Sequence, residues 1–223
     1  MTSSANEKKS GRDAILFAVG KLKELYPDAV CSLDYVGDPW RLLIMARLSA
    51  QCTDARVNIV CATLFSHFPT PEAMADADIE ALENDVRPCG LYRVKARDIK
   101  SISYDLVHKY GGKVPDTMDE LLSLSGVGRK IANLILGDVY GRGGIVTDTH
   151  CIRICGRLGA YPEDMKNPKR AEDILSEIVP PEESSSFCHR LVLFGREVCT
   201  ARSPKCGDCQ LCEACNHIKE HAQ

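Results

Sequence analysis

The C-terminal segment of this sequence contains a group of cysteines whose spacing suits metal ligation. Five of the twelve cysteines fall in the last 25 residues, and no export signal favours disulfides. Four of them follow the pattern Cys199-x6-Cys206-x2-Cys209-x5-Cys215. Closely spaced thiolates hold a zinc ion or an iron–sulfur cluster, and this spacing differs from that of a two-plus-two zinc ribbon. The pattern therefore favours a 4Fe-4S cluster.

A fifth cysteine leaves two ligand sets open. Cys212 creates the run Cys206-x2-Cys209-x2-Cys212-x2-Cys215, which partly matches ferredoxin spacing. Spacing alone does not distinguish ligands 199/206/209/215 from ligands 206/209/212/215. The other seven cysteines are scattered from Cys31 to Cys188, mostly among apolar neighbours. We expect these seven to be small core residues.

A second chemical feature is the segment from Leu121 to Lys130, LLSLSGVGRK, which predicts a helix, a two-glycine hairpin and a second helix. Gly126 and Gly128 permit a tight turn and a close backbone approach to a partner, while Val127 can pack between the helices. The free N–H groups that begin the second helix can donate hydrogen bonds to a phosphate oxygen. Such a hairpin would bind DNA through the backbone without reading its sequence. An ordinary corner between two helices is the simpler alternative.

Two titratable residues follow at positions that suit catalysis. Lys130 lies in the first turn of the second helix beside Arg129, where a solvated or phosphate-contacting side chain is the simpler interpretation. The helix N-terminus, the neighbouring guanidinium and desolvation by bound DNA would all favour a neutral, nucleophilic amine. Asp148 precedes another helix and suits a plain N-cap. The same carboxylate could stabilise a cationic sugar or move a proton.

The elements that must position these residues are predicted to be helices only. Apolar residues recur at helical spacing almost throughout, and no segment alternates with a period of two. We expect about ten helices and an all-α fold. Asp38-Pro39 should open a helix that runs to about Gln51, and Asp116 should cap a helix over 118–124. The last long helix is expected after Ser184–Ser186.

Composition sets broad limits on the function. The 223 residues carry 28 basic and 31 acidic side chains, a net charge of −3, with 44% hydrophobic residues. No apolar stretch approaches the ~18 residues of a membrane-spanning helix, and the polar N-terminus suggests no secretory signal. We therefore expect a globular cytoplasmic protein, associated with the nucleoid if it is prokaryotic.

The charges are unevenly distributed along the chain. Six acidic residues and no basic one lie between Glu72 and Asp85, and seven basic residues follow from Arg87 to Lys113. A second basic run extends from Arg190 to Lys205. For either run, a solvated helix face is the simpler interpretation, and a nucleic-acid surface is the alternative.

With the hairpin, the lysine, the aspartate and the cysteine tail in this order, the chain closely resembles the endonuclease III family of DNA glycosylases. The likeness extends from about residue 12 to residue 217 and includes five segments: LSAQCTD (48–54), CGLY (89–92), LSGVGRK (124–130), VTDTH (146–150) and the cysteine tail. It implies a two-lobed helix-hairpin-helix architecture with a central DNA cleft. A six-helix domain would span 32–142, with the hairpin at about 118–140. Residues 1–31 and 143–223 would form a discontinuous helical domain around the cluster loop, 199–215.

The resemblance also implies roles for individual residues. Lys130 would be the nucleophile and Asp148 the essential carboxylate. Gln51 would fill the space left by a flipped nucleotide, and Leu91 would insert into the base stack. The remaining implied DNA contacts are Gly126, Val127, Gly128, Arg129, His150, Arg202 and Lys205. The implied cluster ligands are Cys199, Cys206, Cys209 and Cys215.

The sequence departs from the family pattern at three places. Ser125 stands where proline usually precedes the hairpin, Cys52 stands where alanine is common, and Cys212 is unusual. None of the three is expected to touch the chemistry directly.

The implied activity is base excision repair by a bifunctional glycosylase. It would remove oxidised pyrimidines from double-stranded DNA and cut the strand 3′ to the abasic site by β-elimination through a lysine Schiff base. A monomer is expected. One alternative is a monofunctional mismatch glycosylase, against which Lys130 argues. A non-enzymatic iron–sulfur module that binds DNA is another. An electron-transfer protein with ferredoxin-like cysteines is a third, but it leaves the segment from Gly126 to Lys130 and Asp148 unexplained.

Overall fold

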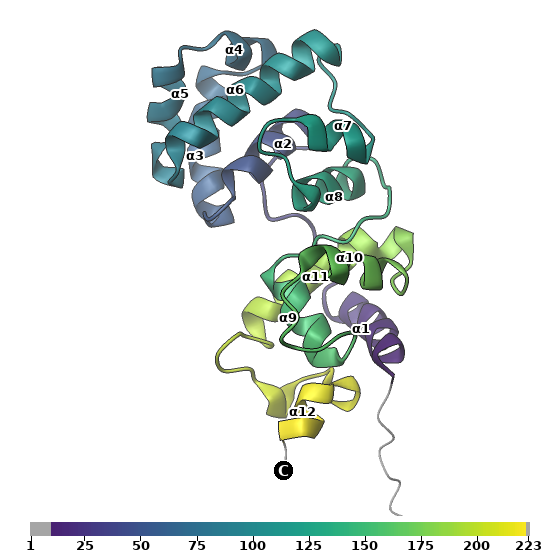
Figure 1. Cartoon of the computed structure of the whole chain (residues 1–223). Helices are drawn as coiled ribbons and strands as arrows, with labels where there is room; N and C mark the ends of the chain where they lie inside the picture. The colour runs from purple at the N-terminus through teal and green to yellow at the C-terminus, as the bar shows by residue number, and fades with distance from the viewer. Residues whose placement is uncertain (1–9, 222–223) are drawn as a thin grey trace, which may run out of the picture. The chain divides into compact units, whose positions relative to one another are not determined.

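The structure, a computed structural model, describes residues 10–221 as an all-helical protein without strands (Figure 1). The predicted all-α class is confirmed. The chain divides into two compact units. We call Cys31–Gly141 the hairpin unit. Met1–Val30 together with Arg142–Gln223 form the cysteine unit, of which residues 10–30 and 142–221 are described.

The hairpin unit contains seven α-helices, where six are expected. They are α2 (Pro39–Leu48), α3 (Asp54–His67), α4 (Pro71–Asp76), α5 (Ile79–Val86), α6 (Tyr92–Lys109), α7 (Met118–Ser123) and α8 (Arg129–Asp138). A 3-10 turn, η1 (Arg87–Cys89), joins α5 to α6. The additional helix is the short α4, which begins with Pro71 at a first-turn position after the cap of Thr70.

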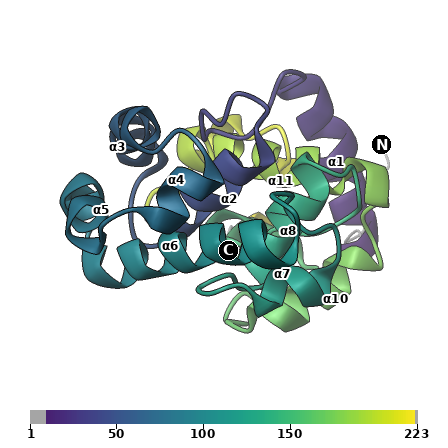
Figure 2. The same cartoon turned by 90° about the horizontal axis from the view of Figure 1, so that it is seen from above.

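The long helix α6 is central to this unit. It packs against α2, α4 and α5, and Figure 2 shows it running beside them. Its buried face contributes apolar side chains to one continuous core: Ala96, Ile99, Ile102 and Leu106. The acidic helices α4 and α5 therefore lie against the basic α6, and Arg93 pairs with Glu83 at 3.8 Å.

The simple interpretation of the first basic run as a solvated face is wrong for two lysines. Lys95 is fully buried, with 0% of its surface exposed. The partly buried Lys100 donates a hydrogen bond to the carbonyl of Ala77. Both side chains reach backbone carbonyls, which replace the lost water.

Three predicted helix boundaries need correction. The helix that opens at Asp38-Pro39 ends at Leu48, because the chain turns sharply before Gln51. Thr117, rather than Asp116, caps α7: helix α7 begins at Met118, and the hydroxyl of Thr117 accepts the N–H of Glu120 at 3.4 Å. Helix α11 begins at Pro181, so Ser184–Ser186 lie inside it.

The cysteine unit is built from helices that are distant in the sequence. They are α1 (Gly11–Leu25), α9 (Thr149–Leu158), α10 (Pro168–Ser176), α11 (Pro181–Glu197) and α12 (Asn216–His221), with the 3-10 turns η2 (Cys206–Asp208) and η3 (Cys212–Ala214). Helices α1, α9 and α11 pack on one another around a second core. In the second basic run, Arg190 is buried and pairs with Glu183 at 3.0 Å, so it belongs to no solvated face.

Most scattered cysteines are core residues, as predicted. Cys61 and Cys89 are buried in the hairpin unit, and Cys151, Cys155 and Cys188 are buried in the cysteine unit. Cys31 and Cys52 are half-buried at the edge of the first core. Over residues 10–221, no helix is both long enough and apolar enough to cross a lipid bilayer.

Candidate DNA-binding and catalytic residues

The glycine hairpin joins α7 to α8 as the sequence predicts. Gly126 has a φ of +69°, and a Cβ atom placed there would lie 2.3 Å from Nε of Arg47. Val127 is buried, and its N–H donates to the carbonyl of Leu124 at 3.2 Å. Gly128 is the N-cap of α8 and supplies no side-chain cap. The first-turn N–H groups of α8 therefore have no capping side chain, an arrangement suited to a phosphate oxygen.

The two predicted catalytic groups each begin a helix, one in each unit. Lys130 is exposed in the first turn of α8, next to the half-buried Arg129. Asp148 is half-buried and caps α9, since its Oδ1 accepts the N–H of Cys151 at 2.7 Å. This bond fixes the direction of the carboxylate and leaves it further acceptor capacity.

Gln51 and Leu91 share an unusual backbone conformation. Their φ values are +55° and +50°, and Val36 is the other non-glycine residue of the described chain with a positive φ. Left-handed backbone at such residues costs on the order of 1–3 kcal/mol and tends to occur at functional sites. Both side chains are exposed, and for Leu91 the exposed fraction is 58%. An exposed leucine on strained backbone suits insertion between bases.

Sequence reasoning missed a group of buried charges beneath these turns. Nζ of Lys95 donates to the carbonyls of Leu48 and Cys89, both at 2.8 Å. Burial lowers the pKa of Lys95 below its usual value. Arg47 donates to Oδ2 of Asp98 from Nε at 2.8 Å and from Nη2 at 2.5 Å. Helical spacing could have revealed Lys95, since it lies four residues before the buried Ile99.

Four of the five C-terminal cysteines line one small cavity. Cys199, Cys206, Cys209 and Cys215 lie on its wall, whereas Cys212 is exposed and does not. Burial raises the pKa of Cys209 to about 11 and also raises the pKa of Cys215. Within the described part, no three His, Cys, Asp or Glu side chains converge on a point that would suit a single metal ion. Four thiols around one cavity nevertheless fit a larger cluster, in which each thiolate binds a different iron.

Arg157 connects this cysteine loop to helix α9. Its Nη1 lies 3.2 Å from Sγ of Cys199, and its guanidinium donates to the carbonyls of Thr200 at 2.8 Å and Ala201 at 3.2 Å. Arg202 and Lys205 lie exposed in the same loop. The loop is therefore held at its base while its basic side chains face solvent.

His150 lies on α9 two residues after Asp148. Its Nδ1 is 3.2 Å from Nη2 of Arg153, which also donates to the carbonyl of Cys199 at 2.9 Å. Gly195 of α11 allows this close packing, because a Cβ atom there would lie 2.3 Å from Nδ1 of His150.

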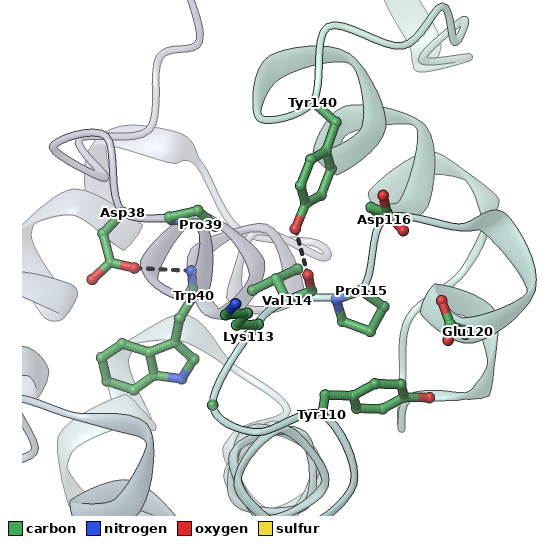
Figure 3. Close-up of a pocket in the computed structure, with 11 residues that line it drawn as sticks. Asp38, Pro39, Trp40, Tyr110, Lys113, Val114, Pro115, Asp116, Glu120 and Tyr140 are labelled. Carbon is green, nitrogen blue, oxygen red and sulfur yellow. Dashed lines mark hydrogen bonds between the residues drawn. The ribbon is translucent and has the colours of Figure 1, made fainter.

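A cavity of about 550 Å³ in the hairpin unit contains none of these residues. Figure 3 shows Tyr110 and Tyr140 at its wall, with the hydroxyl of Tyr140 bonded to the carbonyl of Val114. The cavity lies at the beginning of α2 and beyond the end of α8. The Gln51 turn lies at the other end of α2, and the hairpin lies at the other end of α8. Each of these helices has ten residues, so about 15 Å along the helix axis separates the cavity from either segment.

The sequence and the fold both match known repair proteins. Residues 44–181 match the family described as HhH-GPD superfamily base excision DNA repair protein. Endonuclease III of Synechocystis is 40% identical over 95% of this chain and 94% of its own length. Endonuclease III of Escherichia coli K12 is 36% identical over 88% and 92%. A solved structure of a trapped endonuclease III–DNA covalent intermediate is 40% identical, with a TM-score of 0.88 over 95% of this chain and 99% of that one.

The helical hairpin architecture and these similarities define the class of protein as an HhH-GPD superfamily base excision DNA repair protein. Within that superfamily, the chain belongs to the endonuclease III family.

Proposed function

We propose that this DNA glycosylase and AP lyase of base excision repair uses Lys130 as its nucleophile and Asp148 as its essential carboxylate. The proposal is supported above all by the position of Lys130, exposed in the first turn of α8 directly after the glycine hairpin. A phosphate bound at the hairpin would bring DNA beside this amine. The proposed lesions are oxidised pyrimidines in double-stranded DNA.

The reaction needs the uncharged amine of Lys130. Nζ donates its electron pair to the sugar C1′, and the base leaves with the electron pair of the glycosidic bond and takes up a proton. Opening of the sugar ring gives a Schiff base between Nζ and C1′. Loss of a C2′ proton then breaks the C3′–O bond, and the phosphate leaves on the 3′ side of the lesion.

Asp148 would stabilise positive charge at the sugar and assist proton transfer. Its bond to the N–H of Cys151 holds one carboxylate oxygen at the end of α9. The helix N-terminus favours a negative charge at this position, and a negative charge is what a cationic sugar needs nearby. The same geometry suits both the cap and the catalytic role.

The proposed DNA contacts belong to three features of the chain. Leu91 and Gln51 would occupy the space left by the flipped nucleotide, which costs least to flip where pairing is already poor. Gly126, Val127, Gly128 and Arg129 would bind phosphate through the hairpin backbone. Arg202 and Lys205, together with His150 of α9, would contact the phosphate backbone from the cysteine unit.

Cys199, Cys206, Cys209 and Cys215 would hold the 4Fe-4S cluster, since these four cysteines share the cavity and Cys212 does not. When bound, the cluster supplies four covalent cross-links that fix the loop over 199–215. Arg157 orients Sγ of Cys199 and the following carbonyls. In consequence, Arg202 and Lys205 can meet phosphates at a defined place.

Borohydride trapping on DNA that contains an abasic site tests the nucleophile. The wild-type protein should form a covalent adduct, and Lys130→Ala should form none. Lys109→Ala is the matched control, because Lys109 is also an exposed helical lysine of the hairpin unit and pairs with its neighbour Asp105. Undiminished trapping by Lys130→Ala would remove Lys130 from the mechanism.

Iron analysis of purified variants tests the ligand set. Cys199→Ala should lose iron, whereas Cys212→Ala should retain it. The reverse result would favour the ferredoxin-like set 206/209/212/215.

Because the proposed substrate is genomic DNA and the relatives named above are bacterial, we place the enzyme with the nucleoid in the cytoplasm.

A further inference from the structure

We propose that Lys95 and Asp98, one turn apart on α6, are positioning residues that fix three segments of the hairpin unit in one arrangement. The segments are the Gln51 turn (49–53), the Leu91 turn (89–92) and the hairpin (124–128). The inference rests on the proposed function, which assigns DNA contacts to all three segments.

Lys95 joins the first two segments. Its ammonium is fully buried and donates to the carbonyl of Leu48, the last residue of α2 directly before the Gln51 turn, and to the carbonyl of Cys89, at the start of the Leu91 turn. The two acceptors lie 41 residues apart in the sequence. One side chain therefore ties two distant turns to the same point of α6.

Backbone strain explains why the two turns need such a tie. Gln51 and Leu91 both have positive φ values, a conformation that persists in non-glycine residues only where the surroundings hold it. The acceptor carbonyls lie three residues before Gln51 and two before Leu91. Fixing these carbonyls limits the ways in which each turn can relax.

Asp98 joins the third segment to the same helix. Its Oδ1 accepts the hydroxyl of Ser125 at 2.7 Å, immediately before Gly126. Its Oδ2 accepts hydrogen bonds from Nε and Nη2 of Arg47, which lies on α2 just before Leu48. Ser125 stands where the family usually has proline, so the bond to Asp98 supplies a restraint on the turn that the missing ring would otherwise give.

Stability alone is a weak explanation for these buried charges. Burying an ammonium or an ion pair costs desolvation free energy, and apolar side chains of similar volume often serve the core as well or better. The directional hydrogen bonds instead fix the positions of two carbonyl groups, through Lys95, and of one hydroxyl group, through Asp98. Such specificity matters most at turns that must meet DNA together.

Equilibrium binding to two duplexes tests the role of Lys95. One duplex contains a tetrahydrofuran abasic analogue, and the other is undamaged. We expect Lys95→Met to weaken binding to the abasic duplex by roughly tenfold, equivalent to about 1.4 kcal/mol, and to change undamaged binding by less than about threefold. Ile102→Val, a small change at a buried site of the same helix, is the control and should leave both affinities unchanged.

Asp98→Asn should behave differently from Lys95→Met. Because Asp98 positions the phosphate-binding hairpin, we expect this variant to weaken binding to both duplexes by a similar factor, roughly three- to tenfold. The two variants thus separate lesion recognition from backbone binding, a split that a general loss of stability would not produce.

Unchanged discrimination between the duplexes by Lys95→Met would overturn the proposal, as would equal weakening by Ile102→Val. If Lys95→Met fails to fold, Lys95→Gln serves instead, because its shorter amide can reach at most one of the two carbonyls. Its discrimination should fall by about threefold, half of the effect on a logarithmic scale, and no fall would again overturn the proposal. Borohydride trapping by the wild-type protein is run in parallel, since its failure would contradict the proposed function rather than this inference.

Discussion

The two hairpin glycines differ in what a methyl group would meet, and this difference separates folding from DNA binding. At Gly126, φ is +69° and the new Cβ atom would lie 2.3 Å from Nε of Arg47 and 2.6 Å from Oδ2 of Asp98. At Gly128, φ is −102° and ψ is 175°, and the new atom meets no described heavy atom within 4 Å. Gly126→Ala should therefore destabilise the hairpin unit, and Gly128→Ala should not.

The structure gives the magnitude for Gly126→Ala. Left-handed backbone costs an alanine about 1–2 kcal/mol. The methyl group must also displace the Arg47–Asp98 ion pair, whose side chains are only 12% and 13% exposed. Breaking a buried ion pair completely costs about 3–5 kcal/mol, and displacing it costs only a part of that. Together with the backbone cost, we expect Gly126→Ala to lower the free energy of unfolding by roughly 2–5 kcal/mol. Gly128→Ala should cost less than about 1 kcal/mol, the usual effect of alanine at an N-cap.

Tryptophan fluorescence during urea unfolding measures this difference. Trp40 is the single tryptophan, and it is buried in the hairpin unit, so its emission reports on the unit that contains both glycines. With an m-value of about 2 kcal/mol/M, the Gly126→Ala midpoint should fall by roughly 1–2.5 M. The Gly128→Ala midpoint should stay within about 0.5 M of the wild-type value.

DNA affinity supplies the second half of the test. Gly128→Ala places a methyl group where the backbone is proposed to approach a phosphate, so its affinity for duplex DNA should fall by about tenfold or more despite the stable fold. A Gly126→Ala protein as stable as the wild type would refute the steric reasoning. Full DNA affinity in Gly128→Ala would refute the proposed backbone contact.

Three further perturbations address other parts of the molecule. Burial raises the pKa of Cys61 to about 12 from 9.0, so the folded state keeps a proton that the unfolded chain loses above pH 9. This thiol should therefore lower the free energy of unfolding by about 1.4 kcal/mol between pH 8 and pH 10. In urea unfolding, the loss of stability of Cys61→Ala over the same pH range should be smaller than that of the wild type by this amount. Asp148→Asn keeps a good N-cap, so its unfolding midpoint should barely change while strand cleavage falls by about 100-fold or more; normal cleavage would exclude a catalytic carboxylate. Arg157→Met should lower the iron content of the purified protein, because it loses the bonds to Cys199 and the following carbonyls, and full iron loading would show that the loop needs no such support.

Much of the local structure of the candidate site could be predicted because its signals are local. A two-glycine turn before a helix, a cap at Asp148 and a cysteine tail are each defined within a few residues. Such features depend on φ preferences, capping and ligand spacing, which the sequence carries directly. Helix boundaries could be predicted for the same reason. The prediction was wrong where two neighbouring residues both suit the N-cap position, as Asp116 and Thr117 do.

Only the folded chain distinguishes Cys212 from the other four C-terminal cysteines. Spacing treats Cys212 like the other four C-terminal cysteines, because it contains no information on where the turns η2 and η3 direct each thiol. In the structure Cys212 is exposed, and the other four line one cavity. The direction of a side chain from a short turn depends on packing against distant elements, here α9 through Arg157.

By itself, the sequence determined the all-helical class, the family and the positions of the groups proposed for chemistry. Only the tertiary structure decided that Lys95 is buried beneath two strained turns and that Arg47, Asp98 and Ser125 form one network. The physical reason is that a basic residue in a helix looks the same in the sequence whether it faces water or a carbonyl. Lys95 and its acceptor Leu48 are 47 residues apart in the sequence, and Ser125 and Asp98 are 27 residues apart. Only folding brings the members of each pair within hydrogen-bonding distance.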